Sequence, residues 1–215
     1  MSELPDGIEP APLPEPKDSA LGMVLRRRDD GGFDVLLGRR ARHSRFMPGN
    51  LAFPGGKLEP HDEPERAGAF ERCASRELRE ETGLDIPPEA WCTAGERTTP
   101  PLYPVRFRTL FFVAELPAGA VLPEAPAAPD ELESMAFADP RAVLSDWEAG
   151  VSLVPPPILP ILRRMLVVTF GDAAELAASI AAVNKEEAPN PRIEFIPGVW
   201  VFPVRTRTLP PASCT

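Results

Sequence analysis

The sequence predicts an α/β protein, an α/β/α sandwich in which a mixed β-sheet lies between helices. Short apolar runs bounded by glycine and proline predict strands, and a carboxylate-rich stretch that ends at a glycine predicts a helix. Segments with helix-start residues follow in the second half of the chain. The expected order is βββ–α–ββ–α–α, which fits a sheet covered by helices on both faces.

The element boundaries are predicted from turn and capping residues. Residues 29–32, Asp-Asp-Gly-Gly, predict a hairpin turn. Asp139 followed by Pro140 predicts a helix start, because aspartate caps helices and proline suits their first turn. A break near Gly171 divides the last helical region. Strands are expected at residues 20–25, 33–37, 50–53, 91–97, 106–116 and 131–137, and helices around 76–83, at 139–149 and within 155–184.

Composition limits the class of protein. A length of 215 residues fits one domain with appendages or at most two small domains, and 43% hydrophobic residues can form a core. The net charge of −9 argues against a general nucleic-acid or membrane-surface binder. Cys73, Cys92 and Cys214 lack metal-type spacing, so we expect reduced thiols. With neither a signal-like N-terminus nor a membrane-length apolar run, a cytoplasmic protein is expected.

Residues 76–84, Arg-Glu-Leu-Arg-Glu-Glu-Thr-Gly-Leu, carry the main chemical signal. In a helix with about 100° between residues, the carboxylates of Glu77, Glu80 and Glu81 crowd one face. Like charges at these spacings destabilise a helix by roughly a few tenths of a kcal/mol per pair, and a divalent cation offsets the repulsion. Arg76 is placed to orient a carboxylate. A solvated acidic helix end is the alternative.

With the glycines upstream, this stretch resembles the Nudix box, Gly-x5-Glu-x7-Arg-Glu-U-x-Glu-Glu-x-Gly-U, where U is aliphatic. Residues 76–84 match at every fixed position. After Gly56 and five intervening residues, however, comes Asp62 in place of glutamate, followed by Glu63, and thirteen residues instead of seven separate Asp62 from Arg76. Six extra residues are not a whole number of helical turns, so we expect a loop or a broken first turn. The roles of Asp62 and Glu63 stay open.

The resemblance implies a metal-dependent enzyme that hydrolyses a diphosphate linkage. It implies two or more Mg²⁺ or Mn²⁺ ions on Glu77, Glu80 and Glu81, which would neutralise phosphates and activate water. The backbone carbonyl of Gly55 would join the metal ligands. Gly56, which has no Cβ, would let the backbone approach the metal and the phosphates closely.

Two candidates lie outside the box. Glu131 lies at the start of a later strand, and many family members recruit a carboxylate from this region as general base or metal ligand; a solvated strand edge is the alternative. Arg106 is a candidate for the nucleotide pocket.

A second resemblance covers residues 36–56. They look like the coenzyme A signature of one Nudix branch, Leu-Leu-Thr-x-Arg-Ser/Ala-x3-Arg-x3-Gly-x3-Phe-Pro-Gly-Gly, and only Gly38, in place of threonine, departs from it. Arg40 and Arg45 are arginines of the pattern, and guanidinium groups bind phosphate oxygens bidentately. The resemblance implies coenzyme A or acyl-CoA as first-choice substrate, cut to 3′,5′-ADP and a phosphopantetheine. A solvated basic loop is the alternative.

Other functions remain open. The partner would be a small nucleotide diphosphate, and ADP-ribose or another nucleotide sugar is the alternative substrate. The fold could also bind a nucleotide without catalysis, although such proteins tend to lose box carboxylates and all three helix glutamates are present here. The oligomeric state is open, with a homodimer as one alternative.

Three segments are expected along the chain. Residues 1–17 carry five prolines and predict a disordered lead-in, and residues 18–187 predict the Nudix domain. Residues 188–215 would be a C-terminal extension or the start of a truncated second domain. A strand predicted at 198–204 resembles the opening of a metallo-β-lactamase-like domain, which follows a Nudix domain in some bacterial proteins. The histidine-rich motif of that fold is absent.

Overall fold

A computed structural model describes residues 14–44, 47–100, 105–186, 194–196 and 199–201. Its strands are β1 (Lys17–Arg27), β2 (Phe33–Arg40), β3 (Leu51–Ala52), β4 (Gly55–Lys57), β5 (Cys92–Thr98), β6 (Phe107–Glu115), β7 (Leu132–Ala138), β8 (Glu194–Ile196) and β9 (Val199–Val201). Its α-helices are α1 (Ala69–Thr82), α2 (Pro140–Glu148), α3 (Leu159–Val167) and α4 (Ala173–Glu186). Single turns of 3₁₀ helix occur at Pro60–Asp62 and Pro88–Ala90.

One mixed sheet contains the first seven strands. Its order is β3-β2-β1-β6-β5, with β4 also paired to β1 and β7 also paired to β2. β1 and β6 run parallel over the whole length of β6, and the other pairs are antiparallel. β8 and β9 form a separate antiparallel pair. The prediction of an α/β fold with a mixed sheet is therefore confirmed.

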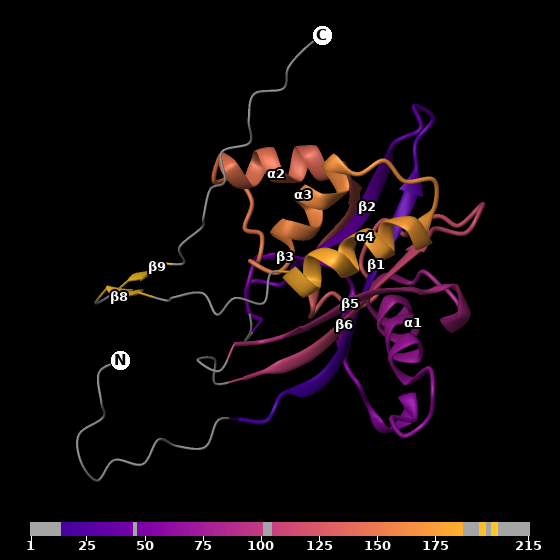
Figure 1. Cartoon of the computed structure of the whole chain (residues 1–215), viewed down its shortest axis with the longest axis horizontal. Coiled ribbons are helices and arrows are strands. Elements are labelled where there is room, and N and C mark those ends of the chain that lie inside the picture. Colours follow the sequence, from indigo (N-terminus) through magenta and orange to yellow (C-terminus); the bar gives the residue numbers. More distant parts are fainter. Residues whose placement is uncertain (1–13, 45–46, 101–104, 187–193, 197–198, 202–215) are drawn as a thin grey trace.

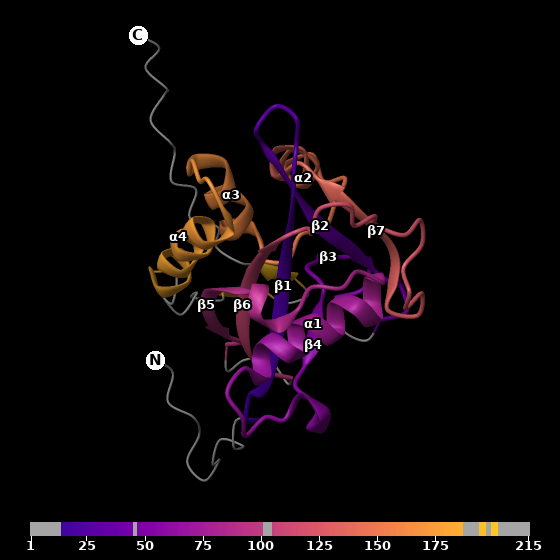
Figure 2. The ribbon, with the colours of Figure 1, turned by 90° about the vertical axis from the view of Figure 1, so that its right-hand side faces the viewer.

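The two faces of the sheet are covered by different helices, as Figures 1 and 2 show. Side chains alternate between the faces of a strand. On β1, Met23 and Leu25 join the core formed with α2, α3 and α4, whereas Ala20 and Val24 join the core beneath α1. On β6, Phe111 packs with the first group and the following residue with the second. The sheet is thus the middle layer of the predicted sandwich.

β1 changes its partner half-way along, and this change creates the framework of the site. Residues 25–27 pair with β2, whereas residues 19–21 pair with β4. The chain enters β4 through Gly55, whose φ of +150° and close approach to the carbonyl oxygen of Ala20 exclude a side chain. The sequence prediction treated Gly55 and its neighbour as the end of a strand, so β4 was missed.

Helix α1 begins and ends at glycines. Gly68 and Gly83 occupy the N-cap and C-cap positions with left-handed backbone conformations, and the Gly83 N–H donates to the carbonyl of Arg79. The six extra residues lie before the helix, in the turn Pro60–Asp62 and the following loop at 63–68. A loop in place of a longer helix was predicted, and the helix bounds agree with it.

Some boundaries differ from the prediction. Lys17 belongs to β1, so the expected lead-in overlaps the sheet by one residue, and residues 1–13 lie outside the described part of the chain. Of the strand predicted at 198–204, Val199–Val201 is described as β9. Residues 198 and 202–204 lie outside the described residues.

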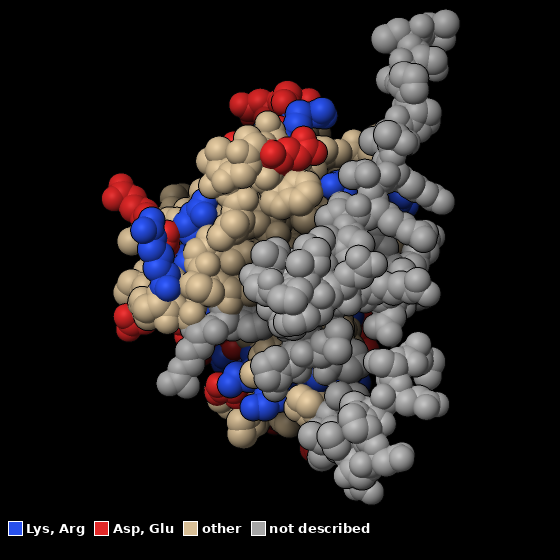
Figure 3. All heavy atoms as spheres, turned by 90° about the vertical axis from the view of Figure 1, so that its left-hand side faces the viewer, with Lys and Arg blue, Asp and Glu red and all other residues tan. Residues whose placement is uncertain are grey.

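Two surface properties complete the description. In the part of the chain that the structure describes, no helix combines the length and the apolar character needed to cross a membrane. On the face drawn in Figure 3, the visible acidic and basic side chains lie interspersed around a broad uncharged area.

Candidate functional site

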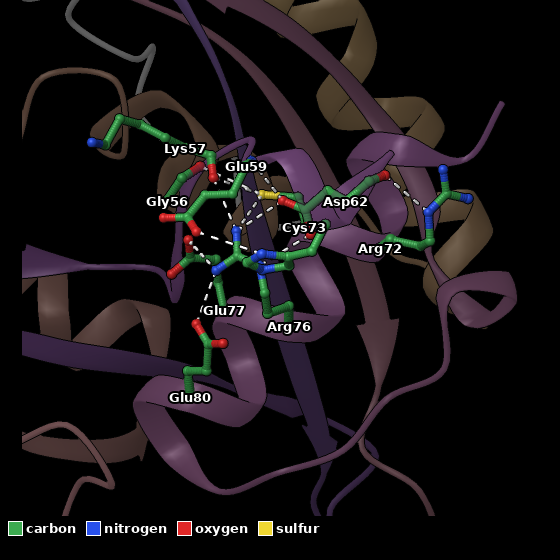
Figure 4. A network of polar contacts seen from close by, with 10 residues as sticks. Gly56, Lys57, Glu59, Asp62, Arg72, Cys73, Arg76, Glu77 and Glu80 are labelled. Atoms are coloured by element: carbon green, nitrogen blue, oxygen red, sulfur yellow. Dashed lines mark hydrogen bonds and ion pairs between the residues drawn. The ribbon is translucent and has the colours of Figure 1, made fainter. Parts of the chain in front are cut away.

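Arg76 is the centre of the carboxylate cluster on α1 (Figure 4). Its side chain is 8% exposed, although guanidinium groups are seldom buried without a partner. One terminal nitrogen, Nη1, donates to Oε1 of Glu77 and to Oε2 of Glu80, each at 2.9 Å. The other, Nη2, donates to the carbonyl of Lys57 at 3.0 Å. The guanidinium group therefore connects two helix glutamates with strand β4.

The remaining donors of Arg76 bind Asp62, the residue whose role the sequence left open. Nε and Nη2 contact the two carboxylate oxygens at 3.0 and 2.9 Å, a bidentate pair. Burial raises the pKa of Asp62, but the Arg76 hydrogen bonds and the Glu59 N–H outweigh it and hold that pKa below the usual value. Asp62 is thus an ionised, 2% exposed partner of the box arginine. The pattern had singled out Asp62 at this position, but its pairing with Arg76 across thirteen residues was not predictable from the spacing.

Glu77 lies against β4. A Cβ at Gly56 would come within 2.3 Å of its Oε1 atom, so a larger residue there would displace this carboxylate. Burial raises the pKa of Glu77, and the nearby Arg76 charge partly offsets the increase. The glycine thus brings the backbone close to a carboxylate, and the approach to a metal and phosphates that the sequence suggested stays a prediction.

Glu81 is the most buried of the three helix glutamates. It is 3% exposed, and its Oε2 accepts a hydrogen bond from the Gly55 N–H at 3.0 Å. The pKa of Glu81 is raised to about 8, mainly by burial and also by the charges of Glu77 and Glu131. The Gly55 hydrogen bond and the charge of Arg40 oppose this increase. A cation bound nearby would stabilise the charged form of this carboxylate, which burial disfavours.

Glu131 and Arg40 come from the neighbouring strands β7 and β2, Glu131 just before β7 and Arg40 at the end of β2. Glu131 lies just before β7, which begins one residue later than predicted, and its charge acts on both Glu77 and Glu81. The loop that carries it is tied to α1, because the Ala127 N–H donates to the carbonyl of Glu81 at 2.9 Å. The structure therefore brings carboxylates from two distant segments together beside one arginine.

Two predicted residues do not join these contacts. Arg106 donates to the carbonyls of Thr99 and Pro14, both at 3.0 Å, and so ties two loops together. Its role as a substrate ligand stays a prediction. Arg45 lies outside the described residues.

The departure of Gly38 from the second pattern has a local cause. A Cβ at this position would lie 2.7 Å from a methyl group of Leu132, which is buried beside β2. Packing between β2 and β7 therefore accounts for the glycine.

Comparison with known proteins agrees with this geometry. A family model described as NUDIX domain matches residues 16–154, more than half of the chain. The chain belongs to the Nudix family. Two curated proteins match shorter stretches of the chain. Nudix hydrolase 22 of Arabidopsis thaliana is 37% identical over 70 residues, which cover 33% of this chain and 22% of that protein. Peroxisomal coenzyme A diphosphatase 1 of Saccharomyces cerevisiae is 38% identical over 76 residues, 35% of this chain and 21% of that protein. The matched segments thus span about a fifth of these relatives.

Solved Nudix structures share the fold over a longer range. A NUDIX hydrolase from Alicyclobacillus acidocaldarius superposes with a TM-score of 0.63 at 23% identity, covering 72% of this chain and 92% of that one. A MutT protein from Methanosarcina mazei superposes with a TM-score of 0.50 at 20% identity, over 72% and 96% of the two chains. Identities this low bear on the architecture alone.

Proposed function

We propose that the protein is a metal-dependent Nudix diphosphatase. The observation that carries the proposal is the cluster of Glu77, Glu80, Glu81 and Glu131 beside the two glycines of β4. Phosphoryl-transfer catalysis depends mainly on positioning and on electrostatic stabilisation of charge. Carboxylates that hold a metal ion in a fixed place would provide both. A buried arginine fixes two of the carboxylates, and the two glycines let β4 approach Glu77 and β1 closely.

The residues present fit a hard divalent cation such as Mg²⁺ or Mn²⁺. All the donors are oxygen atoms, which these ions prefer, and burial makes the charges of Glu77 and Glu81 costly without a cation. Within the described residues, no three acidic, histidine or cysteine side chains are already arranged around one point, because Glu77 and Glu80 turn to Arg76. Glu77, Glu80 and Glu81, with the carbonyl of Gly55, would hold the ion. When bound, it would neutralise the diphosphate and lower the pKa of an attacking water.

The residues themselves would supply positioning and proton transfer. Arg76 holds Glu77 and Glu80 in place, and Arg40 adds positive charge beside Glu81, where an anionic substrate would lie. Glu131, which is exposed just before β7, is our candidate general base. The hydrogen bond from the Ala127 N–H to the Glu81 carbonyl fixes the loop that carries Glu131 to α1.

Coenzyme A or an acyl-CoA is the substrate that we propose first. Support comes from the signature at residues 36–56, from the packing that accounts for its one mismatch, and from the similarity to a yeast protein named as a coenzyme A diphosphatase. ADP-ribose and other nucleotide sugars share the diphosphate that the carboxylate cluster would handle. They are therefore the comparison substrates for the test.

The test is turnover of a panel containing coenzyme A, ADP-ribose and a dinucleoside polyphosphate with Mg²⁺ or Mn²⁺. The wild-type protein should hydrolyse coenzyme A best. Glu80→Gln and Glu81→Gln should each lower kcat by orders of magnitude while the fold is retained, because each removes one charge from the groups that would hold the metal. Near wild-type activity of either variant at saturating metal would contradict the metal assignment. Binding of a nucleotide without turnover of any substrate would instead favour a non-catalytic module.

A further inference from the structure

The loop at residues 63–68 is the part of this chain that the Nudix pattern does not contain, and it stands between Asp62 and the helix that carries the carboxylates. Its backbone has two left-handed positions, Glu63 with a φ of 51° and Gly68 with a φ of 81°. The exposed Arg66 side chain pairs with Glu63 at 2.7 Å. An exposed pair of this kind contributes little, so the loop needs another anchor.

Arg72, on the first turn of α1, supplies that anchor. Its Nε donates to the carbonyl of Asp62 at 3.0 Å, and its Nη1 donates to that of Ala67 at 3.0 Å. Its Nη2 donates to the carbonyls of Glu63 and Arg66 at 3.3 and 3.5 Å. The three nitrogens of one guanidinium group thus hold the loop from its first residue to its end. A planar fork with five donors can do this, whereas the single nitrogen of lysine cannot reach all four carbonyls at once.

These contacts place Asp62 between two arginines of the same helix, as Figure 4 shows. Its main-chain carbonyl accepts from Arg72, and its carboxylate accepts the bidentate pair from Arg76. The third nitrogen of Arg76, Nη1, donates to Glu77 and to Glu80. A continuous series of hydrogen bonds therefore runs from the extra loop to the proposed metal ligands.

We propose that Arg72 is a positioning residue for the metal-binding glutamates, acting through Asp62 and Arg76. The inference rests on the proposed function, because it concerns the same carboxylates. A longer connection would leave Asp62 free to move away from Arg76, and Arg72 compensates by fixing the backbone at Asp62. In a chain with this insertion, a residue at a variable position of the Nudix box becomes necessary for the geometry of its fixed positions.

The test measures Mn²⁺ binding to the full chain by titration calorimetry, without substrate. Arg72→Ala should raise the Mn²⁺ dissociation constant by about tenfold, the lower end for groups that support metal ligands. Arg66→Ala removes a neighbouring arginine side chain of the same loop and should leave that constant within about twofold of wild type, because its exposed ion pair is weak. Arg72→Lys should fall between the two. Melting temperatures measured in EDTA establish that each variant is folded.

A double-mutant cycle separates positioning from general stabilisation. If Arg72 acts through Asp62, Arg72→Ala should weaken Mn²⁺ binding much less in an Asp62→Asn background than in wild type, since interacting residues are not additive. Additive effects would overturn the proposal, as would a lower melting temperature of Arg72→Ala with an unchanged dissociation constant. If the wild type binds no Mn²⁺, the inference fails as well.

The same measurements keep this inference distinct from the proposed function. Wild-type turnover together with equal Mn²⁺ affinity of wild type and Arg72→Ala would leave the diphosphatase standing and remove the role of Arg72. Weakened Mn²⁺ binding in Arg72→Ala, with no turnover of any diphosphate by the wild type, would do the opposite.

Discussion

At Glu81, a carboxylate is withdrawn almost completely from water and keeps a hydrogen bond from the Gly55 N–H. Its pKa of about 8, against a usual 4.5, means that the folded protein retains a proton which the unfolded chain releases at lower pH. Between these values the folded state binds more protons than the unfolded state. The free energy of unfolding of the metal-free protein therefore falls, through this group, as the pH rises from about 4.5 to about 8.

Glu81→Gln should remove this pH dependence. Glutamine can still accept the Gly55 hydrogen bond but carries no charge, so in EDTA the variant should gain melting temperature relative to wild type, and the gain should be larger at pH 8 than at pH 5. Glu80→Gln, on the same helix with a side chain that is 54% exposed, is the control. A gain that is the same at both pH values would show that burial of Glu81 does not govern the stability.

The chemistry of single residues was predictable where it depends on type and local spacing. The glutamates of α1 lie on one face because a helix of 3.6 residues per turn places them there. The pairing of Asp62 and the role of Arg72 were not predicted, since their partners depend on how a loop folds back on the helix. Arg106 was proposed for the nucleotide pocket; its guanidinium contacts two main-chain carbonyls, and its role toward a substrate stays a prediction.

Among the elements, helix α1 and the loop before it have sharply different environments. Residues 63–67 are exposed, whereas α1 buries one face against the sheet. The prediction of a loop came from a length that does not fit whole turns. Strand β4 was missed for a related reason, because two glycines carry no strand signal and their strand exists only through pairing with the distant β1.

Limited digestion of the metal-free protein with trypsin should cut after Arg66 before it cuts within α1. The Arg66 side chain is 71% exposed in a loop, whereas Arg72 and Arg76 belong to a helix that must open locally before a protease can bind it. Mass spectrometry of early fragments identifies the order of cleavage. Protection of the Arg66 bond equal to that of the Arg76 bond would mean that the helix extends through the loop in solution.

At the scale of the molecule, the site is assembled from segments that lie far apart in the sequence. β2 brings Arg40, β4 brings the glycines, α1 brings the glutamates, and the loop before β7 brings Glu131. The fold class was predictable from the order of elements, because that order determines the layers. The convergence of these four segments was predictable only through the family resemblance, since no local pattern encodes it.

The substrate proposal makes different predictions for the two arginines of the coenzyme A signature. The charge of Arg40 acts on Glu81, which puts this arginine beside the carboxylates and hence beside the diphosphate that every candidate substrate shares. Arg40→Ala should therefore lower kcat/KM for coenzyme A and for 3′-dephospho-CoA by similar factors. A loss confined to coenzyme A would place Arg40 at the 3′-phosphate instead.

Arg45 is assigned to the 3′-phosphate by the signature alone, so its variant tests the coenzyme A proposal directly. A lost charge-assisted contact is worth about 1.5–3 kcal/mol, roughly a ten- to hundredfold change. Arg45→Ala should lower kcat/KM for coenzyme A by about that factor and spare 3′-dephospho-CoA, with both rates measured at saturating metal. Equal losses on the two substrates would assign Arg45 to the diphosphate. Brisk hydrolysis of ADP-ribose by a wild-type protein that leaves coenzyme A intact would transfer the proposal to nucleotide sugars, because the carboxylate cluster would then act without any recognition of the 3′-phosphate.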